Sequence, residues 1–259
     1  MNKIFFKILL VSVIQSFLFS NAQFRNRDRL ERSQGVDNNI YGWGFFLALN
    51  NFDYKIVLNP KYGMDNNKNL VVSKPTYSFG AGFITKMRLN DNFDLRVEPG
   101  LQFVERELTF KTQVNDKYAT DANNPFTPLS LTKTDTIRRV KATYIDVPVL
   151  LEFHGDRWYN SRPYAAAGIN YMVNLQSNAK AADDNQQGIF RSTTHNFAWS
   201  AEIGMQFYFS KVKFTPAFRG TFMFNNELVS DNQGTPPYWA AAMSTMQTRA
   251  FMLVLKFEH

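Results

Sequence analysis

The sequence predicts an all-β protein, an eight-stranded antiparallel up-and-down transmembrane β-barrel. Eight segments alternate apolar residues with polar or small ones at a period of two, which is typical of strands. The connections between these segments are alternately long and short. Tight turns on the inner side and long loops on the outer side are typical of a membrane barrel, whereas a soluble sandwich has no reason to keep that order.

The first 22 residues are predicted to be a cleaved signal peptide. Lys3 and Lys7 accompany an apolar run from Ile4 to Phe19, and small or short residues close the segment at positions 20–22. A transmembrane anchor is the alternative, but the run is polar in places and shorter than the roughly 20 residues that a spanning helix needs. We therefore expect the mature chain to start at Gln23.

Residues 23–40 are predicted to form a periplasmic N-terminal arm. The segment is polar and charged and lacks a strand period. One interpretation is an idle disordered tail, and the other is an arm that docks on a partner protein or on anionic headgroups. The residues proposed for docking are Arg25, Arg27, Arg29 and Arg32.

Residues 41–259 are predicted to form the barrel domain. In the first four strands the outward apolar face consists of Trp43, Phe45, Leu47 and Leu49; Tyr77, Phe79, Ala81 and Phe83; Phe93, Leu95, Val97, Leu101 and Phe103; and Ile145, Val147, Val149, Leu151 and Phe153. In the last four it consists of Ala165, Ala167, Ile169 and Tyr171; Phe197, Trp199, Ala201, Ile203, Met205, Phe207 and Phe209; Phe214, Phe218, Phe222 and Phe224; and Phe251, Leu253, Leu255 and Phe257. Short turns are expected near residues 90–92, 154–162 and 210–212.

The inward positions of these strands predict a paired polar network. A barrel of eight strands has room only for side chains in its interior. Acids and bases alternate with Gly and Ser on the inner faces, so we expect them to pair and to limit conduction. The residues assigned to this lumen network are Lys86, Arg88, Asp94, Arg96, Glu98, Asp146, Glu152, Glu202, Arg219 and Lys256.

Composition limits the possible functions. The chain has no cysteine, which excludes disulfides and a lipid-modified cysteine. The formal charge of +7 comes from Lys and Arg scattered among Asp and Glu, so nucleic acid binding is unsupported. No cofactor or metal is predicted, because neither His pairs nor acidic loops with ligand spacing occur.

An enzyme is the less favoured alternative. His195 opens the sixth strand at the outer rim and could act as a base beside Ser192 or Thr194, but a solvated rim histidine is the simpler interpretation. No GxSxG or HExxH motif supports catalysis. We therefore expect a protein without enzymatic activity.

The fourth strand, YIDVPVLLEF, resembles the YxxxPxLLxF pattern of the PorT family of outer-membrane barrels, found in bacteria that run the type IX secretion system. The signal peptide, the Arg-rich start before YGWGFFLALNNFDYKI and the PYAAAGINY strand add to the resemblance. One departure is that Phe257 is followed by Glu258 and His259, whereas many outer-membrane barrels end on an aromatic residue.

The resemblance implies an integral outer-membrane protein that assists type IX protein secretion, and gliding motility where present. Its partners would be outer-membrane lipid and other proteins of the secretion machinery. The alternative is a general small outer-membrane barrel that acts as an adhesin, a minor porin or an envelope anchor. The resemblance supplies no catalytic residues.

Overall fold

The computed structural model describes residue 32 and residues 36–111, 136–181, 190–230 and 240–259. The predicted signal peptide and Arg25, Arg27 and Arg29 lie outside the described residues. The elements are η2 (Val36–Asn38), β1 (Tyr41–Leu58), β2 (Met64–Asp65), β3 (Lys68–Asn69), β4 (Val71–Pro75), β5 (Tyr77–Arg88), β6 (Phe93–Val97), β7 (Gly100–Phe110), β8 (Ile137–His154), β9 (Ser161–Asn174), β10 (His195–Tyr208), β11 (Lys213–Met223), η3 (Ala240–Ala242) and β12 (Met243–Glu258). Among the described residues, no helix has the length and apolar composition needed to cross a bilayer.

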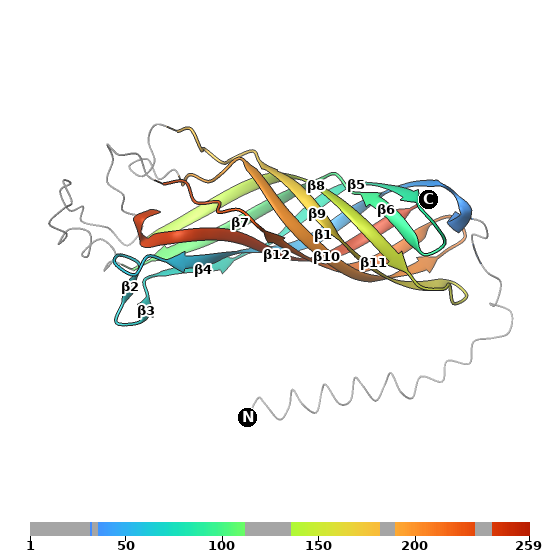
Figure 1. The fold of residues 1–259 in the computed structure, drawn as a ribbon, viewed down its shortest axis with the longest axis horizontal. Coiled ribbons are helices and arrows are strands. Elements are labelled where there is room, and N and C mark those ends of the chain that lie inside the picture. Colours follow the sequence, from blue (N-terminus) through green and yellow to red (C-terminus); the bar gives the residue numbers. More distant parts are fainter. Residues whose placement is uncertain (1–31, 33–35, 112–135, 182–189, 231–239) are drawn as a thin grey trace, which may run out of the picture.

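The main sheet closes on itself as an antiparallel barrel (Figure 1). β1 pairs with β12 on one side and with β5 on the other, which joins the first strand to the last. β4 and β5 share one position in the ring, and β6 and β7 share another, so the described strands fill eight positions. The predicted eight-stranded antiparallel barrel is confirmed.

Two strands that the sequence presents as continuous are each split in the structure. Pro99 has no N–H for a ladder, and β6 and β7 are separate on either side of it. The backbone stays connected there, because Phe83 N donates to Pro99 O at 2.9 Å and Glu98 N donates to Pro148 O at 3.1 Å. The shift between β4 and β5 falls at Thr76, where the register against β7 changes by one residue, as in a β-bulge.

Several strands run further outward than the apolar pattern predicts. β1 continues to Leu58, and β8 begins at Ile137. The alternation of buried and less buried residues continues in these extensions, but the outward positions there include polar residues such as Asp53 and Lys55. An apolar pattern cannot detect the part of a strand that stands above the hydrocarbon region.

A seam in the barrel wall lies in this outer extension. Beyond the Asn51–Tyr77 pair, the described part of β1 pairs only with β12, and β4 pairs only with β7. Tyr54 N–H donates instead to Asp53 Oδ1 at 2.8 Å. This oxygen also accepts a hydrogen bond from Ser73 Oγ at 2.7 Å. Because an open sheet edge is not tolerated in hydrocarbon, the seam lies above the lipid boundary.

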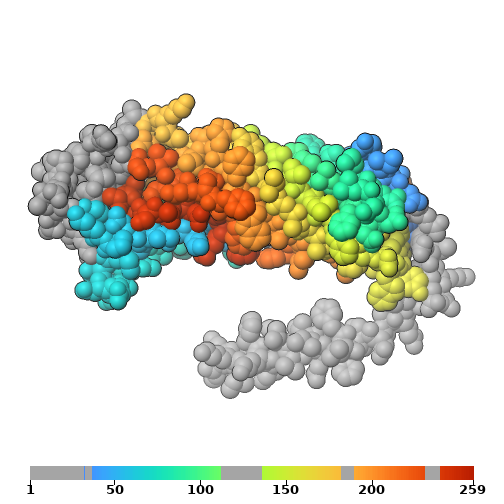
Figure 2. Space-filling model, in the orientation of Figure 1, coloured from blue at the N-terminus to red at the C-terminus, as the bar shows by residue number. Residues whose placement is uncertain are grey.

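The outer wall below the seam is apolar and exposed. Trp43, Phe83 and Ile203 have exposed fractions of 66%, 72% and 64%. Figure 2 shows this wall as one elongated surface to which successive strands contribute. Each of the eight positions in the ring contributes exposed large apolar side chains, as expected for a surface wetted by acyl chains.

Aromatic side chains form a ring at the outer edge of that apolar wall. Ring centroids lie 4.9 Å apart for Phe79 and Phe103, 5.3 Å for Tyr171 and Phe197, and 4.8 Å for Trp199 and Phe222. We name this ring the outer girdle, and its members are Tyr77, Phe79, Phe103, Tyr171, Phe197, Trp199, Phe222 and Phe251. Aromatic belts of this kind mark the membrane–water interface.

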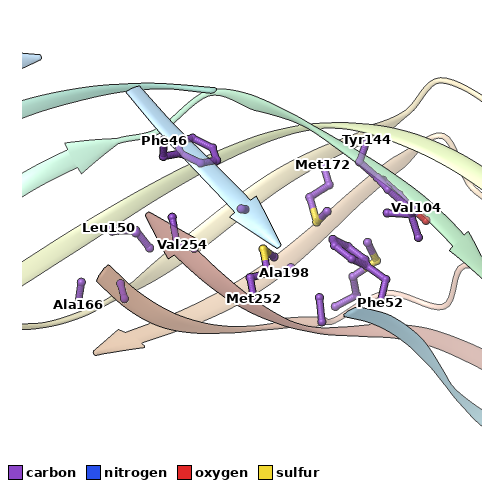
Figure 3. Packing of buried hydrophobic residues seen from close by; sticks show 14 of the residues in the cluster. Phe46, Phe52, Val104, Tyr144, Leu150, Ala166, Met172, Ala198, Met252 and Val254 are labelled. Carbon is purple, nitrogen blue, oxygen red and sulfur yellow. The ribbon is translucent and has the colours of Figure 1, made fainter. Parts of the chain in front are cut away.

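Side chains fill the interior as well as the wall. Phe46, Leu150, Met172 and Val254 belong to a buried apolar cluster inside the barrel (Figure 3). Phe46 lies over Gly82, where a Cβ would approach the ring to 2.6 Å and the Pro99 carbonyl oxygen to 2.4 Å. The glycine therefore makes room for an aromatic ring in the lumen.

Candidate functional site: the polar lumen

Charged side chains on the inner face of the barrel are almost fully buried. Exposed fractions do not exceed 7% for any member of the set Lys86, Asp94, Arg96, Glu98, Asp146, Glu152, Glu202, Lys213, Arg219, Lys256 and Glu258. Burial of an isolated charge costs several kcal/mol, on the order of what the whole fold is worth, so each must be paired or hydrogen-bonded. Every side chain of this set has at least one ion pair or hydrogen bond.

The centre of the network is a cluster of two acids and two bases. Lys256 Nζ lies 2.7 Å from Glu98 Oε1 and also contacts Glu202. Arg219 Nε donates to Glu202 Oε2 at 2.7 Å, and its Nη2 contacts Glu98. Tyr164 donates its hydroxyl to Glu202. Each carboxylate therefore faces two cations, which is the arrangement that offsets desolvation.

Arg96 extends this cluster toward the periplasmic end. Its guanidinium lies 3.2 Å from Glu98, 3.0 Å from Glu258, and in contact with Glu152. Lys213 lies 3.2 Å from the second oxygen of Glu258. Glu258 and Lys213 are not among the predicted members, although Lys213 alternates with the outward residues Phe214 and Phe218 and so has inward parity.

At the periplasmic end, Asp94 lies between two partners. Lys86 Nζ is 3.1 Å from Asp94 Oδ2, and His154 Nε2 is 3.3 Å from the same oxygen. Arg88, by contrast, does not join the network, because it lies at the β5–β6 turn and pairs there with Asp91 at 2.5 Å. The inner-face alternation placed Arg88 in the lumen, but it is the last residue of β5 and reaches out to the turn.

Asp146 is bound by neutral groups. Asn170 Nδ2 donates to its carboxylate at 2.9 Å, Ser200 Oγ donates to Asn170 Oδ1 at 2.6 Å, and Ser200 contacts Thr221 Oγ1 at 2.7 Å. Asp146 has no ion-pair partner among the described residues. This layer continues the polar lumen outward from the ionic cluster.

A second cluster near the outer end centres on Arg106, which is fully buried. Its guanidinium donates to Thr248 Oγ1 at 2.7 Å and to Tyr144 Oη at 3.0 Å, and it lies 3.9 Å from the centroid of Tyr54. Tyr144 in turn donates to Glu227 Oε2 at 3.0 Å. The sequence prediction missed this cluster, although Arg106 keeps the inward alternation of Val104 and Leu108 and could have been found by extending it.

Glu227 comes from the connection between β11 and β12 rather than from a strand. Its Oε1 accepts from Thr248 N at 2.7 Å, and its backbone bonds to Met246 O and Thr193 N at 2.8 and 3.0 Å. Apolar residues cover this end: Leu70, Val71, Leu108, Phe110, Val140, Met243 and Met246. The outer end of the lumen is therefore filled by a connecting segment and by wall side chains.

Part of the N-terminal arm lies against the periplasmic turns. Asp37 accepts from Tyr208 Oη at 2.7 Å and lies 3.3 Å from Arg162 and 3.5 Å from Arg157. Arg32, the described member of the four proposed docking arginines, is exposed; its N–H donates to Asn160 Oδ1 at 2.8 Å, and its carbonyl accepts from Arg157. The described contacts of the arm with the barrel thus include Asp37, the backbone of residue 32, and hydrogen bonds from Arg88 to Asn38 Oδ1 and Ile40 O.

A small cavity at the periplasmic mouth is lined by Lys86, Lys213 and Glu258 and has room for about one water molecule. Among the described residues, no group of three or more His, Cys, Asp or Glu side chains could hold a metal ion.

His195 is the first residue of β10 and lies at the outer rim, as expected. Its Nδ1 is 2.7 Å from Tyr171 Oη, and the two rings stack with centroids 6.0 Å apart. These contacts place the imidazole on the outer face of the barrel, beside the outer girdle. Ser192, considered as a partner, is buried and bonds to Asn174 at 3.0 Å instead.

A closed antiparallel barrel with an apolar exterior and a polar lumen is an integral outer-membrane β-barrel. Residues 21–229 match the family model described as outer membrane protein beta-barrel domain, and the chain belongs to that family. The protein is accordingly located in the outer membrane, as predicted.

Comparison with solved structures gives further barrels at low identity. Neisserial surface protein A is 9% identical with a TM-score of 0.41, covering 83% of this chain and 95% of that one. OprG from Pseudomonas aeruginosa is 9% identical with a TM-score of 0.41, covering 83% and 96%. The outer membrane protease OmpT from Escherichia coli is 8% identical with a TM-score of 0.37, covering 85% and 96%. No activity transfers to this chain at such values, and comparison with curated proteins finds no match.

Proposed function

We propose that this protein is a non-enzymatic outer-membrane barrel with a sealed lumen, which acts as an anchor or adhesin through surfaces outside the barrel. The observation that carries this proposal is the succession of buried, paired polar side chains along the lumen. From the periplasmic end outward come the Asp94 pairs, the Arg96 and Arg219 clusters, the Asp146 layer and the Arg106 cluster. A hydrated solute would have to break each of these layers in turn.

The proposed seal depends on contacts that span the lumen. Glu98 follows β6, whereas its partners Arg219 and Lys256 belong to β11 and β12. Bridges between distant strands draw the walls together and occupy the axis, and opening them would leave buried charges without partners. A minor porin is therefore the less favoured version of the general barrel function.

Conductance in a planar lipid bilayer tests this proposal. The wild-type protein is expected to give no open-channel steps of porin size. A variant with Glu98, Glu202, Arg219 and Lys256 all replaced by Ser removes the central cluster in charge-neutral fashion and should conduct more. Porin-sized steps from the wild-type barrel would overturn the proposal.

A role in type IX secretion is a finer proposal, supported by the resemblance of YIDVPVLLEF to the PorT pattern. The structural positions of the motif residues explain most of it by packing: Tyr144 belongs to the Arg106 cluster, Leu150 is fully buried, and Phe153 faces outward. The motif residues thus serve the barrel wall and lumen, and the export role rests on the resemblance alone. Chromosomal deletion followed by measurement of secreted cargo tests that role, and unchanged secretion would contradict it.

The proposal of no enzymatic activity is tested at His195. The Tyr171 contact gives the imidazole a structural partner on the lipid-facing side of the rim. The variant His195→Ala is expected to leave every function of the envelope intact. A lipid-hydrolysing or acyl-transferring activity of the purified protein that disappears in His195→Ala would reverse this assignment.

A further inference from the structure

Beyond the outer girdle, the outward-facing residues of one half of the barrel are charged. The strands concerned are neighbours in the ring, namely β12, β1, β4, β7 and β8. Their outward side chains in this zone include the bases Lys55, Lys74, Arg139, Lys141 and Arg249 and the acids Asp53, Glu105 and Glu107. We call this zone the collar.

Two of the three acids of the collar form ion pairs with collar arginines. Arg249 lies 2.7 Å from Asp53, and Arg139 lies 3.7 Å from Glu107. Lys55, Lys74 and Lys141 have no ion-pair partner among the described residues. Three lysines of the collar thus have no ion-pair partner among the described residues, whereas Glu105 is the one acid of the collar in that position.

The height of the collar follows from two independent features. The outer girdle marks the membrane–water interface, and Phe251 of the girdle is followed along β12, toward the outside, by Arg249. The seam between β1 and β4 opens beyond Asn51 and Tyr77, where backbone groups must be outside hydrocarbon. Lys55 and Lys74 lie just beyond this level, on either side of the seam.

In the described part of the opposite half, the wall just beyond the girdle has no outward-facing base, and the exposed Lys180 lies further out in the connection after β9. At this level, the outward residues at the outer ends of β9, β10 and β11 are Val173, Leu175, His195 and Phe224. The three lysines are therefore concentrated on one side. Scattered charges that served only solubility would have no reason to follow this division.

We propose that the collar binds the phosphate groups of an outer-leaflet phosphorylated glycolipid, whose acyl chains pack on the apolar wall below. The lysines Lys55, Lys74 and Lys141 would supply the cationic contacts, and the girdle aromatics would meet the upper ends of the chains. Such a lipid fits because one molecule combines anionic groups at headgroup height with acyl chains at the height of Leu49 and Phe103.

The probe is a bis-phosphorylated glycolipid incorporated in bilayers with the intact protein, with lipid retention measured by native mass spectrometry after gentle detergent release. The collar variant is Lys55→Gln, Lys74→Gln and Lys141→Gln combined. The matched control is Lys68→Gln, Lys180→Gln and Lys211→Gln, which removes three exposed lysines from outer connections and a periplasmic turn. Both variants have the same net charge.

The collar variant is expected to retain at least tenfold less phosphorylated glycolipid than the control. Wild-type protein should bind the dephosphorylated lipid no better than phosphatidylcholine. The proposal would be overturned if the collar and control variants retained the phosphorylated glycolipid equally. It would also be overturned if the wild-type protein bound the dephosphorylated lipid as well as the phosphorylated one. If the triple variant fails to fold, each single Lys→Gln change should lower retention about fivefold, as expected for one surface lysine near anionic lipid, and three unchanged singles would likewise overturn it.

Discussion

Lys256 on β12 and Glu98, which follows β6, meet in the middle of the lumen with Nζ and Oε1 2.7 Å apart. β1 and β5 stand between their strands in the ring, so the pair bridges the interior rather than one ladder. Both side chains are completely buried. The contact makes the centre of the barrel depend on charge balance.

Replacement of Glu98 by Gln is expected to destabilise the barrel strongly. The change keeps the shape but leaves Arg219 and Lys256 with less negative charge, and breaking a buried pair by losing one partner costs about 3 to 5 kcal/mol. The measurement is the urea midpoint of unfolding in lipid vesicles, read from the heat-modifiable band on electrophoresis. The control is Glu105→Gln, on the outward face, which should change the midpoint little; equal midpoints for both variants would contradict a central role for Glu98.

Replacement of Gly82 by Ala is expected to destabilise the barrel, because the new methyl group would meet Pro99 O at 2.4 Å and the Phe46 ring at 2.6 Å. Overpacking of this kind costs about 1 to 3 kcal/mol. Gly42→Ala is the control, since its nearest neighbour is Lys86 Cε at 3.5 Å. Unfolding midpoints measured in parallel should fall only for Gly82→Ala.

Replacement of Glu227 by Ala is expected to release the connection between β11 and β12 from the outer mouth. The change removes acceptors for Tyr144 Oη and Thr248 N and leaves Arg106 without nearby negative charge. Limited proteolysis of intact cells from outside should then cut the described part of this connection, residues 224–230 and 240–242, at least several times faster. Glu105→Ala serves as the control, and unchanged cleavage in Glu227→Ala would show that the buried carboxylate does not hold the segment.

Replacement of Asp37 by Asn is expected to loosen the arm at the periplasmic face. Its carboxylate holds Tyr208 and two arginines, whereas an amide offers one acceptor and no charge. Because the chain has no cysteine, a single Val36→Cys carries a spin label that reports local mobility. Mobility should rise in Asp37→Asn and stay constant in Asp156→Asn, an exposed acid in the neighbouring turn.

The alternation of apolar and polar residues along each strand predicted which side chains face outward and which face the lumen. Trp43, Phe83 and Ile203 face outward, and Asp94, Glu98 and Glu202 face inward, as alternation alone required. Successive side chains of a strand point to opposite faces, so a residue's parity determines its side once one face is identified. The order of long and short connections likewise followed from the sequence.

The sequence could not assign partners within the lumen. Arg88 and Lys213 both satisfy the inward parity, yet Arg88 turns toward Asp91 and Lys213 binds Glu258. Glu227 has no strand parity at all and reaches the lumen from a connecting segment. Which charges meet depends on the register of each strand pair around the closed ring, and register brings together residues more than a hundred positions apart, such as Glu98 and Arg219. Alternation along one strand contains no record of that register, so only the closed barrel decides the pairing.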